Sequence, residues 1–490
     1  MQLFRRHPKA LPFLFLTEMW ERFGFYIVQG MLVLYASQQL GFSDDESYTL
    51  SGSFTALVYI APILGGALAD KVLGFKRAIL WGGVFLSMGY ALLSFSWAAG
   101  FYIALATIIV GNGLFKPNIS SLLGTLYTPQ DTARDAGFTL FYVGINSGIL
   151  LAGISSGLIK NHFGWHASFA AASVGLLVGL GIFILGIVRG DIPSQPTFSV
   201  IEKKRFLTKP WLILYCLFTI GVLSFFLKSN LVSQWLLPII GIGLLFFIFM
   251  MVFKQDAMHR KNMFTLNILI LASVIYWTFY LQMFFSINFF IERLVHKQMM
   301  GISIPTTVFY SLESIFVILL GPVCAWFWQR LHETAVNPSP YIKFVIAIFL
   351  VGIAFLILAL GTYFTPANEQ VNLIWVVFSY LLISIGELLL SPIGLSTITL
   401  LAPTHMAGLM MGVWFVALGF GGGLGGWLAE LASVPAGVDS RVTQLLIYQS
   451  AFLDYALFAF AIAAALGISW LVARKFMFNK QELEQNLTTT

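Results

Sequence analysis

Long apolar runs separated by short polar segments extend along the whole sequence. A run of about 20 mostly apolar residues is long enough to cross a bilayer as a helix. Such runs predict fourteen membrane-spanning helices, at roughly 12–40, 49–70, 78–98, 101–127, 138–160, 166–188, 211–228, 235–253, 264–291, 305–329, 342–364, 371–401, 407–432 and 448–472. The pattern therefore predicts an all-α polytopic membrane protein.

A polar, basic segment near residues 189–210 divides these spans into groups. It contains Pro193, Pro196 and Pro210, which is typical of a linker. Six spans precede it, two spans without buried charge follow, and six more complete the chain, an order typical of two-bundle secondary transporters. We expect an N-terminal six-helix bundle at 1–190, a cytoplasmic linker at 191–210, an inserted transmembrane hairpin at 211–260, a C-terminal six-helix bundle at 261–476 and a cytoplasmic tail at 477–490.

Composition and charge support the membrane assignment and add an orientation. The chain has 490 residues, of which 58% are hydrophobic and 10% charged, against about 25% charged in soluble proteins. Its two cysteines lie in apolar runs, so no disulfide framework is expected. If the N-terminus is cytoplasmic, twenty basic residues outside the spans fall inside the cell, and five fall outside it: Lys160, Lys228, Arg293, Lys297 and Arg441. This bias predicts cytoplasmic termini and explains the net charge of +6 without a nucleic-acid surface.

The first span carries an unusual polar face. Glu18, Glu21, Arg22, Phe25 and Tyr26 are spaced so that all five lie on one side of a helix. Ionisable groups facing lipid are costly, so this face is expected to line a protein interior or a wet cavity. The alternative is that Glu18 and Arg22 form an i,i+4 pair that only helps the helix to pack.

Few other ionisable residues lie deep in the spans. They are Lys116, Glu313 and Glu387, and none of the seven histidines falls in the middle of a span. A metal site and an enzymatic function are therefore unsupported, no cofactor is expected, and proton transfer would fall to carboxylates. A lone buried lysine needs a partner, which the acids of the first span can supply. Ion pairs that only fix helix packing are the alternative for Lys116 and Glu387.

The loop between the second and third spans has a further pattern. It reads Gly66-Ala67-Leu68-Ala69-Asp70-Lys71-Val72-Leu73-Gly74-Phe75-Lys76-Arg77. This resembles the Gly-x-x-x-Asp-(Arg/Lys)-x-x-Gly loop, followed by basic residues, of the major facilitator superfamily. A glycine turn with an acid and several bases can hold neighbouring helix ends together. A generic basic turn is the alternative reading.

Motifs in both halves together resemble one transporter family. In the N-terminal half they are Glu18-x-x-Glu21-Arg22-Phe23-x-Phe25-Tyr26, Ser53-Phe54-Thr55-Ala56-Leu57-Val58-Tyr59, Gly113-Leu114-Phe115-Lys116-Pro117-Asn118 and Phe141-Tyr142-Val143-Gly144-Ile145-Asn146-Ser147-Gly148. In the C-terminal half they are Tyr280-Leu281-Gln282-Met283, Glu387-Leu388-Leu389-Leu390-Ser391 and Gly412-Val413-Trp414-Phe415. They resemble the signatures of the proton-dependent oligopeptide transporter family of the major facilitator superfamily. The inserted hairpin and Gln282 are similar to the bacterial di- and tripeptide permeases of that family.

The resemblance implies a role for each of these residues. Arg22 and Lys116 would receive the carboxylate of a peptide, and Glu387 with Asn146 would receive its ammonium group. Glu18 and Glu21 would couple proton binding to the release of the two cations. Tyr26, Tyr59 and Gln282 would contact the peptide backbone, and Trp414 would wall a side-chain pocket. For Tyr59 and Trp414, ordinary helix packing is an equal alternative.

Three positions depart from the family pattern. Phe25 replaces the first tyrosine of the usual pair, and Phe284-Phe285 stand where a Pro-Thr pair is common. Glu313, expected near the peptide ammonium, stands where an asparagine is usual. Its added charge predicts a second proton per cycle or a preference for peptides with a lysine or arginine side chain. The alternative is that Glu313 stays protonated and donates a hydrogen bond.

Taken with its motifs, the chain is expected to be a proton-coupled symporter that imports di- and tripeptides by alternating access. The resemblance implies a major facilitator fold in a bacterial inner membrane, acting as a monomer and driven by the proton gradient alone. One rival is a carrier of the same fold for another solute, such as nitrate. A rival of another class is a peptide receptor that does not transport, or a membrane enzyme.

Overall fold

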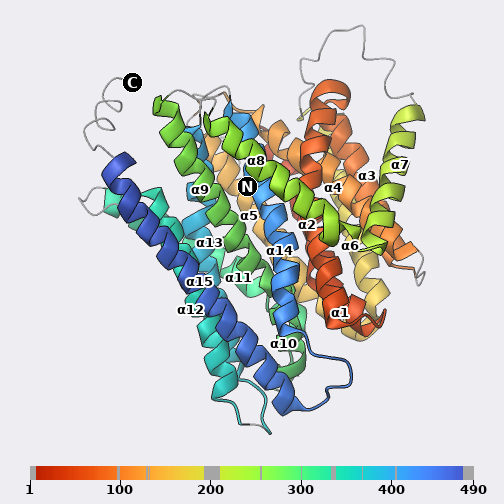
Figure 1. The fold of residues 1–490 in the computed structure, drawn as a ribbon. Helices are drawn as coiled ribbons and strands as arrows, with labels where there is room; N and C mark the ends of the chain where they lie inside the picture. The colour runs from red at the N-terminus through yellow and green to blue at the C-terminus, as the bar shows by residue number, and fades with distance from the viewer. Residues whose placement is uncertain are drawn as a thin grey trace.

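The chain is almost entirely helical in a computed structural model (Figure 1). The structure describes residues 7–95, 100–128, 131, 133–192, 210–253, 257–299, 301–332, 338–366, 368–402 and 406–477. Every predicted span corresponds to helix, so the all-α polytopic fold is confirmed. Among the described residues, ten helical segments are long and apolar enough to cross a bilayer by composition. Helix α1 (Leu11–Gln38) is not one of them, in keeping with the charged residues it carries.

The helices follow the predicted order. After α1 come α2 (Asp44–Leu68), α3 (Phe75–Leu93), α4 (Phe101–Gly124), α5 (Arg134–Phe163) and α6 (Trp165–Val188). The inserted pair is α7 (Pro210–Lys228) and α8 (Leu237–Phe253), joined through a π-helix at Val232–Leu236. The second half has α9 (Ala257–Tyr280), α10 (Ser286–Leu294), α11 (Ser311–His332), α12 (Pro340–Tyr363), α13 (Leu373–Leu401), α14 (Ala407–Ala429) and α15 (Arg441–Met477), with a short hairpin of β1 (Gln298–Met299) and β2 (Ile302–Ser303).

The ninth span is not the single helix expected from its apolar run. A 3₁₀ turn at Leu281–Phe284 separates α9 from α10, and Phe285 has φ −113° and ψ −103°, outside the helical region. The Ser286 hydroxyl donates to Oε1 of Gln282 at 2.7 Å across this break. The residues of the turn are buried, so hydropathy continues through the break and does not reveal it.

The second span begins earlier than predicted, at Asp44 instead of residue 49. Ser43 and Glu46 form a capping box, in which each side chain accepts a hydrogen bond from the backbone of the other. Acidic residues are favourable in a first helical turn because of the helix dipole. A prediction based on apolar runs leaves out such a polar turn.

The loop after α2 confirms the expected glycine turn. A π-helix (Ala69–Leu73) ends at Gly74, whose φ of 73° is suited to glycine. Lys76 donates to the backbone oxygen of Ile192, just beyond α6, at 2.9 Å. This base therefore holds a neighbouring helix end, as the motif predicts, while Asp70 is exposed.

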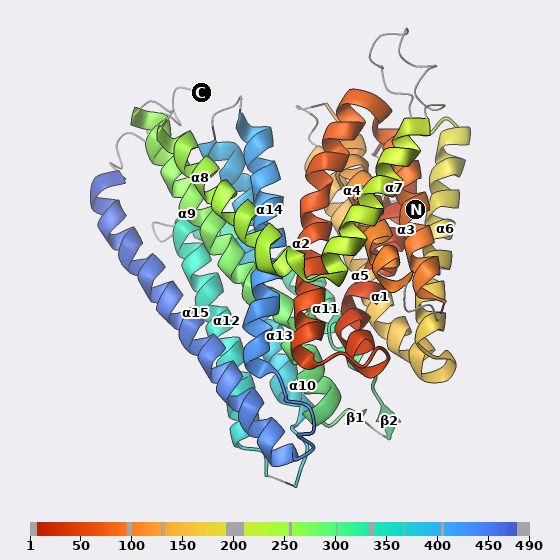
Figure 2. The ribbon, with the colours of Figure 1, turned by 45° about the vertical axis from the view of Figure 1, so that its right-hand side comes forward.

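The helices pack in two halves, which lie side by side in Figure 2. In the first half α1 packs against α5 and α6, and α3 against α4 and α6; in the second, α12 packs against α13 and α15, and α9 against α14. The halves meet through α2 with α14 and through α5 with α11. At the first contact, a Cβ on Gly52 would lie 2.9 Å from Cα of Gly426, so glycines permit the close approach. The inserted pair touches both halves, with α7 on α4 and α8 on α9.

The exact domain boundaries stay a prediction, and most of the linker and tail lies outside the described residues.

Polar contacts join the two halves at the end of the molecule where α1 ends and α2 begins, which we call the Asp44 end (lower end of Figure 2). Arg293 of α10 donates to both carboxylate oxygens of Asp44, at 2.6 and 2.7 Å. Thr49 donates to Glu430 at 3.0 Å. These contacts hold the halves together at the Asp44 end.

Candidate functional site

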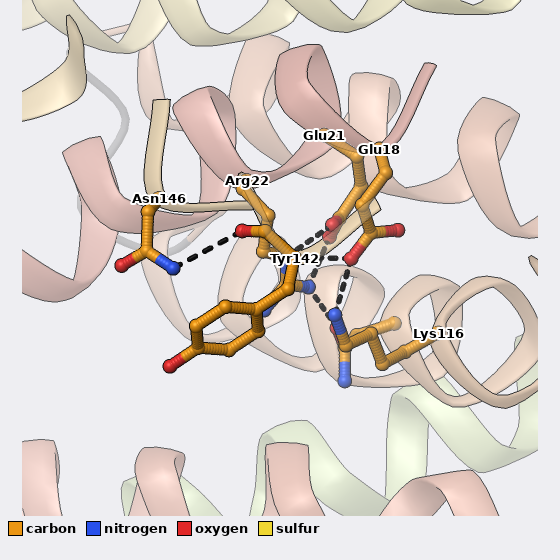
Figure 3. Close-up of polar contacts among 7 residues, drawn as sticks. Glu18, Glu21, Arg22, Lys116, Tyr142 and Asn146 are labelled. Carbon is orange, nitrogen blue, oxygen red and sulfur yellow. Dashed lines mark hydrogen bonds and ion pairs between the residues drawn. The ribbon is translucent and has the colours of Figure 1, made fainter. Parts of the chain in front are cut away.

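Four ionisable side chains of α1 and α4 point toward one another (Figure 3). Arg22 donates from Nε and Nη2 to the two carboxylate oxygens of Glu21, at 2.5 and 2.6 Å. Lys116 forms an ion pair with Oε1 of Glu18, which also lies 3.6 Å from Nε of Arg22. The Nη2 group of Arg22 donates further to Asn112 Oδ1 at 3.2 Å. The structure thus pairs Lys116 with an acid of the first span, as is expected for a lysine that lies inside an apolar span.

This cluster balances two acids against two bases in a buried place. Glu18 and Glu21 are inaccessible, whereas the side chain of Lys116 is 26% exposed. Buried charges are tolerated when each has an opposite partner, and removing one partner is costly. Oε2 of Glu18 is buried and has no hydrogen-bond partner among the described residues.

Helix α4 is held so that Lys116 reaches α1. The Asn112 amide donates to the backbone oxygen of Val58 at 2.9 Å, which ties α4 to α2. Gly65 of α2 has no room for a Cβ because the Gly113 backbone fills that space. The glycines and asparagine around Lys116 therefore act in helix contact, and they fix the helix that carries the lysine.

A second pair of acids lies in the other half. Glu313 of α11 is 4% exposed and Glu387 of α13 is 9% exposed. Their carboxyl groups lie within electrostatic reach of each other, and Ser314 donates to Oε2 of Glu313 at 3.1 Å. Neither acid has a basic partner within the described part of the chain. The pair is therefore unlike the compensated cluster on α1 and α4.

Tyrosines connect the two groups. Tyr142 of α5 and Tyr280 of α9 lie close to the Glu387 carboxyl group, so a tyrosine of the first half approaches an acid of the second. Asn146 lies one turn further along α5 and donates to the backbone oxygen of Tyr142 at 3.1 Å (Figure 3). Tyr142 is 42% exposed although it lies on the face of α5 that meets the other half. The packing of the two halves therefore leaves part of this tyrosine uncovered in the present conformation.

The expected tyrosines of α1 and α2 lie between these groups. Tyr26 lies close to Tyr59 and is within electrostatic reach of Arg22 on one side and of Glu313 and Glu387 on the other. Phe25 is buried, and its ring centre lies 4.7 Å from the Arg22 guanidinium. The missing hydroxyl at Phe25 is thus replaced by a cation–π contact.

Gln282 and Trp414 do not join the group in this conformation. The Gln282 amide is fully buried and donates to the backbone oxygens of Gly425 and Thr278, at 2.8 and 3.1 Å. Trp414 is buried in the core of the second half against Phe344 of α12, with ring centres 6.1 Å apart. Contacts of Gln282 and Trp414 with a peptide stay predictions.

Comparisons with known proteins show the family of this chain. A family model described as "POT family" matches residues 76–445, which is most of the chain. The chain belongs to the POT family. The dipeptide and tripeptide permease A of Citrobacter koseri is 34% identical over 98% of this chain and 95% of its own length. That of Proteus mirabilis is 36% identical over 94% of this chain and 93% of its own length.

Solved structures agree with the POT assignment. One, described as giving structural insights into substrate recognition in proton dependent oligopeptide transporters, has a TM-score of 0.82 and 29% identity, covering 95% of this chain and 99% of that one. A crystal structure of tetrameric PepTSo2 has a TM-score of 0.82 and 28% identity, covering 96% of this chain and 99% of that one. With its apolar spans, this POT-family chain is a multi-pass membrane protein.

Three further residues adjoin the candidate site, and the sequence analysis assigns them no role. Tyr142 and Tyr280 lie close to Glu387, and Asn112 accepts a hydrogen bond from Arg22. Each lies inside or directly beside one of the family motifs, so its position in the sequence already pointed to the candidate site. The contacts themselves depend on how α5, α9 and α13 pack, which no local pattern contains. No group of three His, Cys, Asp or Glu side chains among the described residues is placed to hold a metal ion.

Proposed function

We propose that this protein is a proton-coupled symporter that imports di- and tripeptides. The observation that carries the proposal is the opposition of Arg22 and Lys116 in one half to Glu313 and Glu387 in the other, with Tyr26 in electrostatic reach of both groups. A peptide carries a carboxylate at one end and an ammonium at the other, so its two ends match the two groups. Arg22 offers a planar fork to a carboxylate, and Lys116 a point charge.

Charge balance gives the proposed coupling. The cluster of Glu18, Glu21, Arg22 and Lys116 is neutral when all four are ionised. A proton on Glu18 or Glu21 makes it +1, which matches the arriving carboxylate. Protonation and carboxylate binding therefore favour each other, and coupling needs no cofactor besides the proton gradient. At 100 mV one net charge is worth about 2.3 kcal/mol, which is roughly fifty-fold accumulation at about 1.4 kcal/mol per tenfold.

Alternating access is the proposed means of movement. The contacts at the Asp44 end close one side, while Tyr142 is accessible. With the termini in the cytoplasm, as the distribution of basic residues favours, the Asp44 end faces outward and this conformation is open inward. The named relatives are bacterial permeases, which supports an inner-membrane location. All groups of the site come from one chain, so we propose a functional monomer, although the relative PepTSo2 crystallises as a tetramer.

The proposal is tested by uptake of labelled dialanine into vesicles that contain the purified protein. We expect accumulation above the outside concentration when the proton gradient points inward, and only equilibration without it. Labelled nitrate serves as the control solute. Uptake of nitrate without dialanine would favour the rival carrier of the same fold, and dialanine binding without entry would favour a receptor.

A further inference from the structure

The acid pair of Glu313 and Glu387 contains one carboxyl group more than the binding of a peptide ammonium requires. The two buried carboxyl groups lie within electrostatic reach of each other, and Ser384 of α13 donates to the backbone oxygen of Glu313 at 3.5 Å, yet no cation compensates the acids within the described residues. Oε2 of Glu387 is in addition buried without a hydrogen-bond partner. One carboxylate is enough to receive one peptide ammonium, so the second acid needs its own explanation.

The side chains that face the pair from other helices are neutral hydroxyls. They are Tyr26 of α1, Tyr59 of α2, Tyr142 of α5, and Tyr276 and Tyr280 of α9; on the helices of the pair itself, Tyr380 of α13 faces Glu313 and Ser314 of α11 lies beside it. Arg22, which also acts on Tyr26, is engaged by Glu21. No residue of this lining can supply a compensating positive charge.

Two carboxyl groups close together at a buried place cannot both be ionised, because like charges repel strongly where water is excluded. They share one proton and behave as one group with a net charge of −1. In the free site the pair thus resembles a single carboxylate. A peptide with a neutral side chain brings one ammonium, which matches this charge and leaves the shared proton in place.

We propose that the pair is a proton-exchange site that selects peptides with a lysine or arginine side chain on their first residue. Such a peptide brings two positive charges close together, the terminal ammonium and the side-chain cation. The O–H bond of the shared carboxylic acid breaks, its proton leaves to solution, and both Glu313 and Glu387 become carboxylates. Two negative charges then face two positive ones, so the loaded site stays neutral. This inference rests on the proposed function, because it assumes that a peptide ammonium binds here.

Proton release upon binding gives a measurable signature. Binding that releases one proton strengthens up to tenfold for each pH unit of increase, in the range where the shared proton is present. We would measure binding of Lys-Ala to the full-length protein at several pH values. Norleucyl-alanine is the control peptide, because its first side chain has the same length without the charge. The affinity ratio of Lys-Ala to norleucyl-alanine should rise with pH in the parent.

Variants test whether the pH dependence of the affinity ratio comes from the acid pair. In Glu313→Gln the ratio should be independent of pH and at least tenfold lower at the highest pH, whereas norleucyl-alanine still binds. Glu313→Asn should behave in the same way. Glu369→Gln removes a negative charge from an exposed loop and should retain the parent's behaviour. A ratio with the same pH dependence in the parent and in Glu313→Gln overturns the inference.

Infrared difference spectra provide a second readout that does not depend on affinity. Adding Lys-Ala to the parent should remove the carbonyl stretch of a protonated carboxylic acid, and norleucyl-alanine should retain it. This difference should be absent in Glu313→Gln. If the parent binds norleucyl-alanine but Lys-Ala leaves the band unchanged, the inference fails while the proposed function stands. If the parent binds neither peptide, both fail.

Discussion

Arg293 is expected to set the balance between conformations, although it lies at the far end from the binding groups. Asp44 is 5% exposed and the Arg293 side chain 25%, and two short hydrogen bonds join them. The backbone N–H of Val434 donates to the same carboxylate at 2.9 Å. Asp44 therefore ties α2 both to α10 and to the segment that follows α14.

Replacing Arg293 by leucine would leave Asp44 buried without its cation. Truncating one partner of a buried, hydrogen-bonded charge pair costs about 2–5 kcal/mol. At about 1.4 kcal/mol per tenfold, the conformation closed at the Asp44 end should lose roughly thirty-fold or more in population relative to the open one. The Tyr448 hydroxyl, 3.3 Å from Arg293, does not replace the charge.

The assay is a distance distribution between spin labels at positions 39 and 439, which are exposed on the two halves at this end. Cys216 and Cys324 are first replaced by serine. We expect Arg293→Leu to shift the distribution toward longer distances. Arg441→Leu, which removes a nearby cation that does not contact Asp44, should leave it unchanged. An unaltered distribution in Arg293→Leu would refute the idea that this pair holds the halves together.

Three further predictions concern the membrane-embedded groups. Glu21→Gln should abolish accumulation driven by a proton gradient while peptide exchange between equally loaded compartments continues; accumulation at the parent level would remove Glu21 from the coupling. Dipeptides with an amidated C-terminus should compete with dialanine at least tenfold less well than free acids, and Lys116→Ala should reduce that difference; equal competition in the parent would exclude carboxylate recognition. Gln282→Leu should lower the free energy of unfolding by about 1–3 kcal/mol, because the Gly425 oxygen and the Ser286 hydroxyl lose a partner; unchanged thermal stability would argue against this structural role.

The fold was largely predictable because hydropathy and charge are local properties. Apolar runs placed the helices, and spacing on one helix put Glu18, Glu21 and Arg22 on one face. Apolar runs do not include the polar first turn of α2, although Ser43 and Glu46 carry a clear capping signal there. The break before α10 was missed because its residues are as apolar and buried as those of a continuous helix.

The site was only partly predictable, because its contacts join residues far apart in sequence. Lys116 had a foreseeable partner, since a buried lysine requires an acid and few were available. The proximity of Glu313 to Glu387 depends on the packing of α11 against α13, and the contact of Arg293 with Asp44 joins α10 to α2. For Gln282, peptide contact stays a prediction. A motif suggested ligand contact, whereas the surrounding backbone engages its amide in this conformation.

Proton-coupled symport requires that peptide and protons enter together, and one measurement follows the entry of both. Vesicles containing the protein and a pH-sensitive dye are exposed to dialanine at an inside-negative potential, with no initial pH difference. The account predicts that the lumen acidifies as labelled dialanine enters, and that Glu21→Gln exchanges dialanine without acidification. Entry of dialanine into parent vesicles with no change in luminal pH would contradict proton-coupled symport.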